Sequence, residues 1–354
     1  MFYNIVEFHY LYKNINDMDF QSIIRVLSKE QKKELVDLLS RDLNVPKLSM
    51  LIDDLNKDRP ISCPHCQSFD IYGHGSYKDR KRYKCKSCIK TFNDLTGTAM
   101  DGIKKVDEFQ DYLVLMIQSM SIRKAAKKIG VNVKTIFDWR HKLLSCLSIF
   151  NGEEFSGIVE CDDKQLSINN KGSRDLERKP YKRPSDRQTK RGVSNDKVSI
   201  MVATDRNDNP VMRIAKIGRI DVNSIENTIG TLIKPDNVLC SDSHPSIIKW
   251  AKEKEMEHHT FIASKHIKDK CYHVQYVNSI DNRYERWIKP FYGVSTKYLS
   301  GYLNWFVFLL KIKESLSQVL DIVKIMIKNV MAINTYKAIE ENYKKLINPH
   351  YSKT

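Results

Sequence analysis

The chain has 354 residues, enough for two or more domains with cores of their own. Its 59 Lys and Arg outnumber 43 Asp and Glu, and the formal charge of +16 favours a polyanionic partner. The first residues lack a basic region followed by an apolar stretch, and the longest apolar run, Trp305–Leu310, is too short to cross a bilayer. We therefore expect a soluble cytoplasmic protein rather than a secreted or membrane protein.

The first 60 residues are predicted to be helical. A polar segment, Asp53–Pro60, then forms a linker to the next part of the chain. We assign residues 1–60 to a helical N-terminal segment. Apolar side chains recur there at the spacing of one helix face, at Ile23, Ile24, Val26, Leu27, Leu35, Leu38 and Leu39.

Two C-x-x-C pairs follow the linker, with eighteen residues between them. Each pair places two thiolates on one tight turn, and two pairs complete the tetrahedral four-sulfur shell of structural zinc. Glycine and aromatic residues between the pairs favour short hairpin strands, so we predict a zinc ribbon over residues 61–99 with one zinc ion. Two disulfides or chance clustering are the alternatives, and they do not suit an intracellular chain. The predicted ligands are Cys63, Cys66, Cys85 and Cys88.

Residues 100–150 are helical again, and Ser121–His141 has the pattern of a helix-turn-helix. Gly130 suits the turn, and Ala125 is small where two helices must approach. The second helix is expected to present polar side chains to DNA, and two helices that merely pack together are the alternative. The expected outward residues are Asn132, Lys134, Thr135, Asp138, Arg140 and His141, with Arg123 and Lys124 as further DNA contacts on the first helix.

Two segments concentrate basic residues. Between His74 and Lys90 there are seven Lys or Arg against Asp79 alone, and Lys171–Lys197 holds ten basic against four acidic residues. Solvated surfaces usually mix both signs of charge, so these runs favour contact with phosphate.

From Gly157 onward the pattern alternates between strands and helices. Three strands are predicted first, and the second and third are joined by a hairpin turn at Asp205–Asn209. A helix with Asp221 as its N-cap, a strand, a helix, a strand and a last helix beginning after Val277 follow. This is the order of an RNase H-like α/β domain, predicted over residues 157–312. The fold class is thus a multidomain α+β chain, with a C-terminal helix over 313–354 that packs on the chain or mediates dimerisation.

Acidic residues follow two of the predicted strands. Asp162 and Asp242 come directly after the first and fourth strands, which lie side by side in such a sheet. Two neighbouring carboxylates repel each other unless a cation neutralises them, and oxygen ligands suit Mg2+ or Mn2+. We predict two such ions, as in metal-dependent cleavage of phosphodiesters. A third ligand is expected from the last helix, where Asn278, Asp281 and Glu285 share one face.

These motifs resemble bacterial insertion-sequence transposases that join a zinc ribbon to a DDE-type catalytic domain, in the branch where Asn often takes the third position. The resemblance covers about residues 62–310. Its motifs are the cysteine pairs, Gly157–Asp162, Arg191–Ser194, Leu239–Asp242, His273–Ser279, Gly293–Leu299 and Tyr302–Trp305.

The resemblance implies that Asp162, Asp242 and Asn278 are catalytic and hold Mg2+. Asn278 follows Asp242 after thirty-five residues, a spacing usual in the family. The chain departs from the family at Asp163, where Glu is common, and at Glu285, where Lys is usual. Asp281 and Glu285 are therefore possible substitutes for the third ligand.

We therefore expect a transposase that binds double-stranded DNA at its element ends and at a target, close to the bacterial nucleoid and as a dimer or larger multimer. A catalytically inactive DNA-binding regulator is the alternative, and an RNase H-like RNA nuclease is a third. His273 is expected to contact phosphate or to pack at a helix start. Further expected DNA contacts are Arg191, His273 and Lys297.

Overall fold

A computed structural model gives the fold, and its contacts divide the chain into two compact units. The first consists of Met1–Asp94, Ile103–Gln110 and Ser315–Lys324, and the second of Leu95–Gly102, Asp111–Glu314 and Ile325–Thr354. Most of the expected helical segment 1–60, and Arg191, lie outside the described residues. The structure describes residues 28, 31, 48, 52–54, 61–77, 80–173, 176, 197–262, 267–268, 271–311, 317–328 and 336–348.

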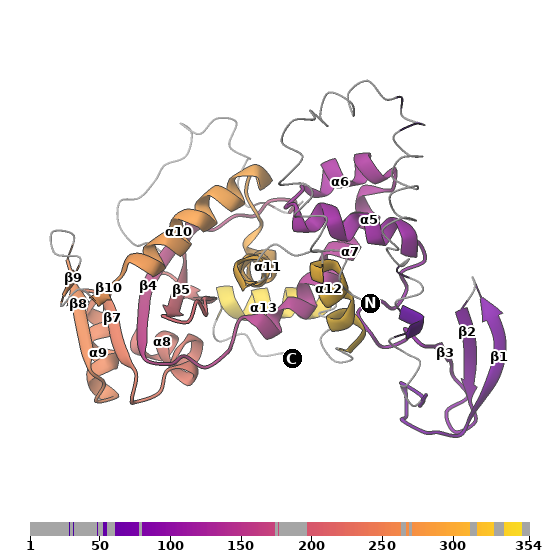
Figure 1. Ribbon diagram of the computed structural model, residues 1–354, viewed down its shortest axis with the longest axis horizontal. Coiled ribbons are helices and arrows are strands. Elements are labelled where there is room, and N and C mark those ends of the chain that lie inside the picture. The colour runs from indigo at the N-terminus through magenta and orange to yellow at the C-terminus, as the bar shows by residue number, and fades with distance from the viewer. Residues whose placement is uncertain are drawn as a thin grey trace, which may run out of the picture. The chain divides into compact units, whose positions relative to one another are not determined.

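A small antiparallel sheet follows the first cysteine pair (Figure 1). Its strands are β1 (Ile71–Tyr77), β2 (Arg80–Cys85) and β3 (Thr91–Asn93), in the order β1-β2-β3. Phe92 and Tyr83 stack beneath the buried thiols, with ring centroids 5.7 Å apart. This core is too small to support a fold by its size alone, which is why such modules depend on a metal or a disulfide.

Three helices connect the small sheet to the large one: α5 (Val106–Ile117), α6 (Ile122–Ile129) and α7 (Val133–Cys146). Gly130 ends α6 with φ of +80°, a conformation that favours glycine. Asn132 begins α7, because its side chain accepts a hydrogen bond from the amide of Lys134 at 2.8 Å. The two helices and the turn therefore lie where the sequence predicts them.

A five-stranded mixed sheet, in the order β6-β5-β4-β7-β8, forms the centre of the second unit. β4 pairs antiparallel with β5 and parallel with β7, so the first and fourth strands are neighbours as predicted. The strands are β4 (Ile158–Ser167), β5 (Lys197–Asp205), β6 (Val211–Ile217), β7 (Val238–Asp242) and β8 (His258–Phe261).

Helices cover both faces of this sheet. α8 (Val222–Thr228) and α9 (Pro245–Glu253) share one apolar core with it, and α10 (Gln275–Ile288) and α11 (Leu299–Lys311) share the other. Figure 1 shows α10 running along β4 and β5. Asp221 caps α8 as predicted, since its carboxylate accepts from the amide of Ser224 at 2.8 Å. The mixed α/β class is confirmed.

Two predicted boundaries near the site are wrong. β4 continues to Ser167 instead of ending before Asp162, because it keeps pairing with β5 after its ladder with β7 has ended. α10 begins at Gln275 rather than after Val277, because the carboxylate of Glu160 accepts from the amides of its first turn. Asp162 and Asn278 therefore lie inside regular elements.

The segment 313–354, predicted as one helix, contains two described helices, α12 (Ser317–Lys328) and α13 (Tyr336–Ile347). The sheet β9 (Ile267–Lys268) and β10 (Tyr272–His273) precedes α10. Within the described ranges, no helix is both long and apolar enough to cross a membrane.

Candidate active site and metal centre

Two aspartates of the large sheet lie at neighbouring positions on adjacent strands. The parallel pairing of β4 and β7 ends with Cys161 opposite Ser241, so Asp162 and Asp242 come next on the two strands. Side chains alternate between the faces of a sheet, and Cys240 belongs to the core that contains α10. Asp242, two residues further, therefore faces α10. Adjacent strands lie about 4.8 Å apart, so the structure brings the two predicted carboxylates together.

Helix α10 forms the third wall of the site. Glu160, two residues before Asp162 on β4, accepts hydrogen bonds from the first turn of α10. Lys164, two residues after Asp162, places its Nζ 3.7 Å from Asp281 Oδ2 and 2.9 Å from Glu285 Oε1. These contacts show that the face of β4 carrying Asp162 is turned toward α10. Asp162 therefore lies opposite the part of the helix between the two sets of contacts.

Asn278 and Asp281 occupy that part of α10, one helical turn apart and on one face. Asn278 is half-buried. The side chain of Asp281 is 18% exposed, and its Oδ1 is buried without a hydrogen-bond partner among the described residues. Glu285, the other expected substitute, has a side chain that is 66% exposed and paired with Lys164. Asn278 and Asp281 therefore lie on the part of α10 opposite Asp162, and Glu285 lies at its exposed end.

The buried carboxyl groups oppose ionisation. Burial raises the pKa of Asp162 to about 7, and repulsion from Asp242 adds to the effect. Burial also raises the pKa of Asp242. The pKa of Asp281 rises to about 6 for the same reason, although the neighbouring Lys164 ammonium lowers it. The site therefore concentrates negative charge in a poorly solvated place.

This donor set fits a hard divalent cation. Carboxylate and amide oxygens are the ligands that such ions prefer, and a cation would relieve both the repulsion and the burial of Asp162 and Asp242. The orphaned Oδ1 of Asp281 is a buried acceptor that a cation would satisfy. Within the described chain, these three carboxylates do not all come within 4.8 Å of one another.

Four cysteines beside the small sheet form a second candidate metal site. Their Sγ atoms all lie within 4.8 Å of one another. Cys63 and Cys88 are 3.5 Å apart at sulfur, and Cys66 and Cys85 are 3.6 Å apart. A disulfide needs about 2.05 Å, whereas a tetrahedral ion with about 2.3 Å bonds to sulfur sets about 3.8 Å between sulfurs. Backbone amides, chiefly that of Cys88, lower the pKa of Cys85 to about 6, which favours a thiolate. The geometry fits a four-thiolate metal site.

The residues expected to contact DNA on α6 and the start of α7 are accessible. Arg123 and Lys124 are exposed on α6. Lys134 is also exposed, with its Nζ 2.9 Å from a carboxylate oxygen of Asp138. Thr135 is half-buried.

Arg140 is the clearest departure from the sequence prediction, because the structure buries it completely. Its Nε donates to the hydroxyl of Tyr112 at 2.9 Å, and its Nη2 donates to the carbonyl of Met120 at 2.6 Å. Its guanidinium carbon lies 4.9 Å from the ring centroid of Trp305, within the range of a cation–π interaction. The expectation that Arg140 faces outward is therefore wrong.

His141 is likewise directed inward. Its ring clusters with those of Phe137 and Tyr298, whose centroids lie 4.3 and 4.4 Å from it. Burial lowers the pKa of His141 to about 4, so it is neutral near pH 7. The cause for both residues is the continued packing of α7, whose second half is buried on more than one side.

The remaining expected DNA contacts have partners within the protein. His273 Nδ1 lies 3.0 Å from Glu160 Oε1, as expected for an imidazole packed at a helix start. Lys297 has a side chain that is 15% exposed and lies 3.7 Å from Glu340.

Sequence reasoning missed Glu160 and Lys164, the two residues that join β4 to α10. The alternation of side chains along a strand would have placed both on the face of Asp162, had the strand been extended to its true end. Arg206, the third missed residue, contacts Glu160 from the turn after β5, and no sequence pattern indicated that contact.

Comparison with known proteins shows what this part of the chain is similar to. Residues 154–310 match the family described as ISXO2-like transposase domain. Over 148 residues the chain is 28% identical to an uncharacterized protein in transposable element ISH50 of Halobacterium salinarum, which covers 41% of this chain. The match spans 50% of that relative, about half of its length. A solved structure of a pre-cleavage Mos1 transpososome is 10% identical in sequence, and the match covers 64% of this chain and 78% of that chain. Its TM-score of 0.17 is too low for a conclusion about the fold.

Proposed function

We propose that this chain, whose residues 154–310 match an ISXO2-like transposase domain, cleaves DNA at the ends of its own element and joins those ends to a target. The observation that carries the proposal is the meeting of Asp162 and Asp242 on adjacent strands beneath α10, where Asp281 has a buried carboxylate oxygen with no hydrogen-bond partner among the described residues. Clustered carboxylates in a poorly solvated site are typical of metal-dependent phosphoryl transfer.

The topology supports an RNase H-like assignment for this domain. Three antiparallel strands lead into a parallel pair, and the acidic residues follow the parallel ladder of β4 and β7. Ligand sites of mixed α/β sheets lie at the carboxyl ends of their parallel strands. We retain residues 157–312 as the proposed catalytic domain, 61–99 as the zinc ribbon and 100–150 as the helix-turn-helix.

We assign Asp162 and Asp242 as the residues that hold Mg2+ or Mn2+, with Asp281 and Asn278 completing the site from α10. When bound, such ions polarise the scissile phosphate and favour loss of a proton from the attacking water or 3′-hydroxyl. The oxygen of that nucleophile attacks phosphorus, and the 3′ oxygen of the cleaved bond leaves. Lys164 orients Asp281 from β4, since its ammonium lies 3.7 Å away.

The basic surfaces outside the site support binding to duplex DNA. Arg123 and Lys124 on α6, with Lys134 on α7, are exposed and suited to phosphate contact. The cysteine centre is assigned one structural zinc, which holds the ribbon and its exposed Lys81 and Lys90 in place. Cleavage at two ends and joining to a target favour a dimer or a larger multimer on DNA.

A non-catalytic DNA-binding regulator is the second candidate, and one observation favours it. The ammonium of Lys164 already lies near Asp281 and Glu285, so part of the negative charge is balanced within the protein. A carboxylate that is already paired with an ammonium group binds a metal cation more weakly.

The deciding experiment incubates the purified chain with duplexes that carry the ends of its element, with and without Mg2+ or Mn2+. The proposal predicts nicking or cutting at the element boundary that requires the metal and disappears in Asp162→Ala and in Asp242→Ala. Exposed Asp236→Ala is the matched control and should cleave normally. DNA binding without cleavage by the unmutated chain would support the regulator instead.

A further inference from the structure

Glu160 is a buried acid whose role the proposed chemistry does not explain. It lies on β4 two residues before Asp162, and its side chain is only 1% exposed. Buried carboxylates are rare unless they are fully paired, because removing the charge from water is costly. Its partners therefore indicate what it does.

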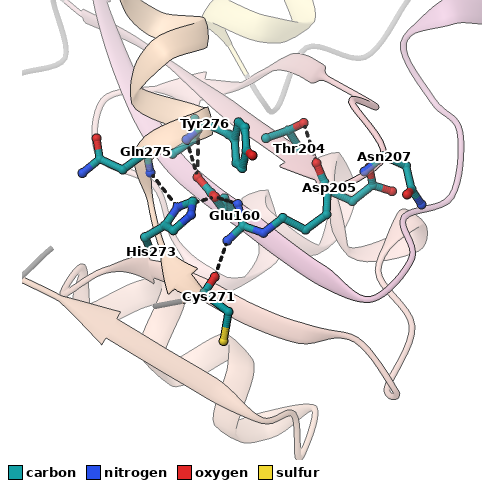
Figure 2. A network of polar contacts seen from close by, with 10 residues as sticks. Glu160, Thr204, Asp205, Asn207, Cys271, His273, Gln275 and Tyr276 are labelled. Atoms are coloured by element: carbon teal, nitrogen blue, oxygen red, sulfur yellow. Dashed lines mark hydrogen bonds and ion pairs between the residues drawn. The ribbon is translucent and has the colours of Figure 1, made fainter. Parts of the chain in front are cut away.

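The partners of Glu160 surround the beginning of α10 (Figure 2). Oε2 accepts from the backbone amides of Tyr276 at 2.8 Å and Val277 at 3.1 Å, both in the first helical turn. Oε1 lies 3.0 Å from His273 Nδ1, just before the helix, and contacts the guanidinium of Arg206. Both carboxylate oxygens are thus engaged.

Arg206 extends this cluster to the neighbouring segments. Its Nη2 donates to the carbonyl of Cys271 at 2.9 Å, and its guanidinium carbon lies 4.8 Å from the ring centroid of Tyr276. The positive charge of Arg206 balances Glu160 where water is scarce. One carboxylate therefore joins β4, the turn after β5 and the start of α10.

The helix lacks a cap of its own. Val274 occupies the N-cap position of α10 and has no side-chain acceptor for the free amides of the first turn. Glu160 satisfies two of these amides from another element, and its negative charge is favourable at the positive end of a helix. The position of α10 along β4 is therefore fixed at its first turn.

We propose that Glu160 is a positioning residue that sets α10 over the site, so that Asp281 and Asn278 face Asp162. The inference rests on the proposed function, because α10 carries ligands of the proposed metal site. Asp162 is two residues from Glu160 on the strand, and Asp281 is four residues beyond Val277 on the helix. A shift of α10 by one residue would move its ligands by about 1.5 Å and rotate them by about 100°.

The test compares Glu160→Gln with Glu226→Gln. Glu226 also uses both carboxylate oxygens, accepting from Trp250 Nε1 and from Lys254, each at 2.8 Å, but it lies on α8 outside the site. Amide hydrogen exchange is measured across α8, α9 and α10. In the same proteins, Mn2+ affinity is measured by electron paramagnetic resonance, and kcat is measured at saturating DNA and metal.

For Glu160→Gln we expect exchange over residues 275–281 to rise at least about tenfold while α9 is unchanged. We expect Mn2+ affinity and kcat to fall about 10- to 100-fold, as for residues that orient metal ligands. Glu226→Gln should change neither the Mn2+ affinity nor kcat. Wild-type-like exchange in α10, or an equal rise throughout the second unit, would overturn the proposal.

If Glu160→Gln does not fold, Arg206→Gln decides the same question, because it removes the balancing charge and leaves the carboxylate in place. The same local rise in exchange is expected, and its absence would also overturn the proposal. A wild-type chain that neither binds Mn2+ nor cleaves DNA would refute the proposed function alone, since the exchange measurement does not depend on metal or DNA.

Discussion

Replacing Asp162 with Asn should stabilise the chain in the presence of a chelator, although it removes a residue that the proposed chemistry needs. Burial and the nearby Asp242 raise the pKa of Asp162 from 3.8 to about 7. Between these pH values the unfolded chain has lost this proton while the folded chain still holds it. Raising the pH from 4 to 7 therefore favours the unfolded state, and the loss of stability is complete above pH 7.

The magnitude follows from the two pKa values. A rise of about three pH units corresponds to about 4 kcal/mol at roughly 1.4 kcal/mol per unit, and this full cost applies near pH 8. At pH 5 the cost is below about 2 kcal/mol. This pH is only about one unit above the pKa of the unfolded carboxyl, so only part of the difference between the two states has accumulated. Asn keeps the shape of the side chain and can still accept the amide of Asp163, which now donates to Oδ1 at 2.8 Å. The stability gained by Asp162→Asn should therefore be about 2–3 kcal/mol larger at pH 8 than at pH 5.

Urea unfolding in EDTA at both pH values measures this difference, with Asp236→Asn as an exposed control. Adding Mn2+ should reverse the ranking at pH 8, because only the unmutated chain gains the free energy of binding the ion. An Asp162→Asn chain that is no more stable than the unmutated chain at pH 8 would refute the electrostatic reasoning.

Three further outcomes are expected. Cys85→Ser should release the zinc that we expect at one ion per chain, and atomic absorption after dialysis would show it; full retention of zinc would contradict the four-thiolate site. Arg140→Ala should lower the free energy of unfolding by about 3 kcal/mol in urea titrations, because it leaves the hydroxyl of Tyr112 and the carbonyl of Met120 without their donor. Asp281→Asn should reduce cleavage at least about 100-fold, whereas Glu285→Gln should stay within about threefold; an equal or larger loss in Glu285→Gln would contradict the choice of Asp281.

The order of strands and helices could be predicted from sequence because each element carried a local signal. Apolar strands ended near turn residues, and Asp221 and Gly130 marked helix ends. The pairing of β4 with β7 followed from that order, and it was sufficient to bring Asp162 and Asp242 together.

The errors arose where distant contacts decide the outcome. α10 begins early because its cap comes from Glu160, more than a hundred residues away in the chain. The sequence predicts Arg140 to be an exposed cation on a helix surface. Tyr112, Met120 and Trp305 enclose it instead, and no local sequence pattern indicates these contacts. The choice between Asp281 and Glu285 likewise required Lys164, which engages the carboxylate of Glu285 and leaves one oxygen of Asp281 without a partner among the described residues.

We propose above all that Asp162 and Asp242 hold the catalytic cation together with α10. Crystals of the chain grown with Mn2+ and measured at the manganese absorption edge test it most directly. We expect an anomalous peak within about 2.5 Å of carboxylate oxygens of both aspartates, with an oxygen of Asp281 or Asn278 nearby. A manganese peak elsewhere, or none at saturating Mn2+, would contradict it.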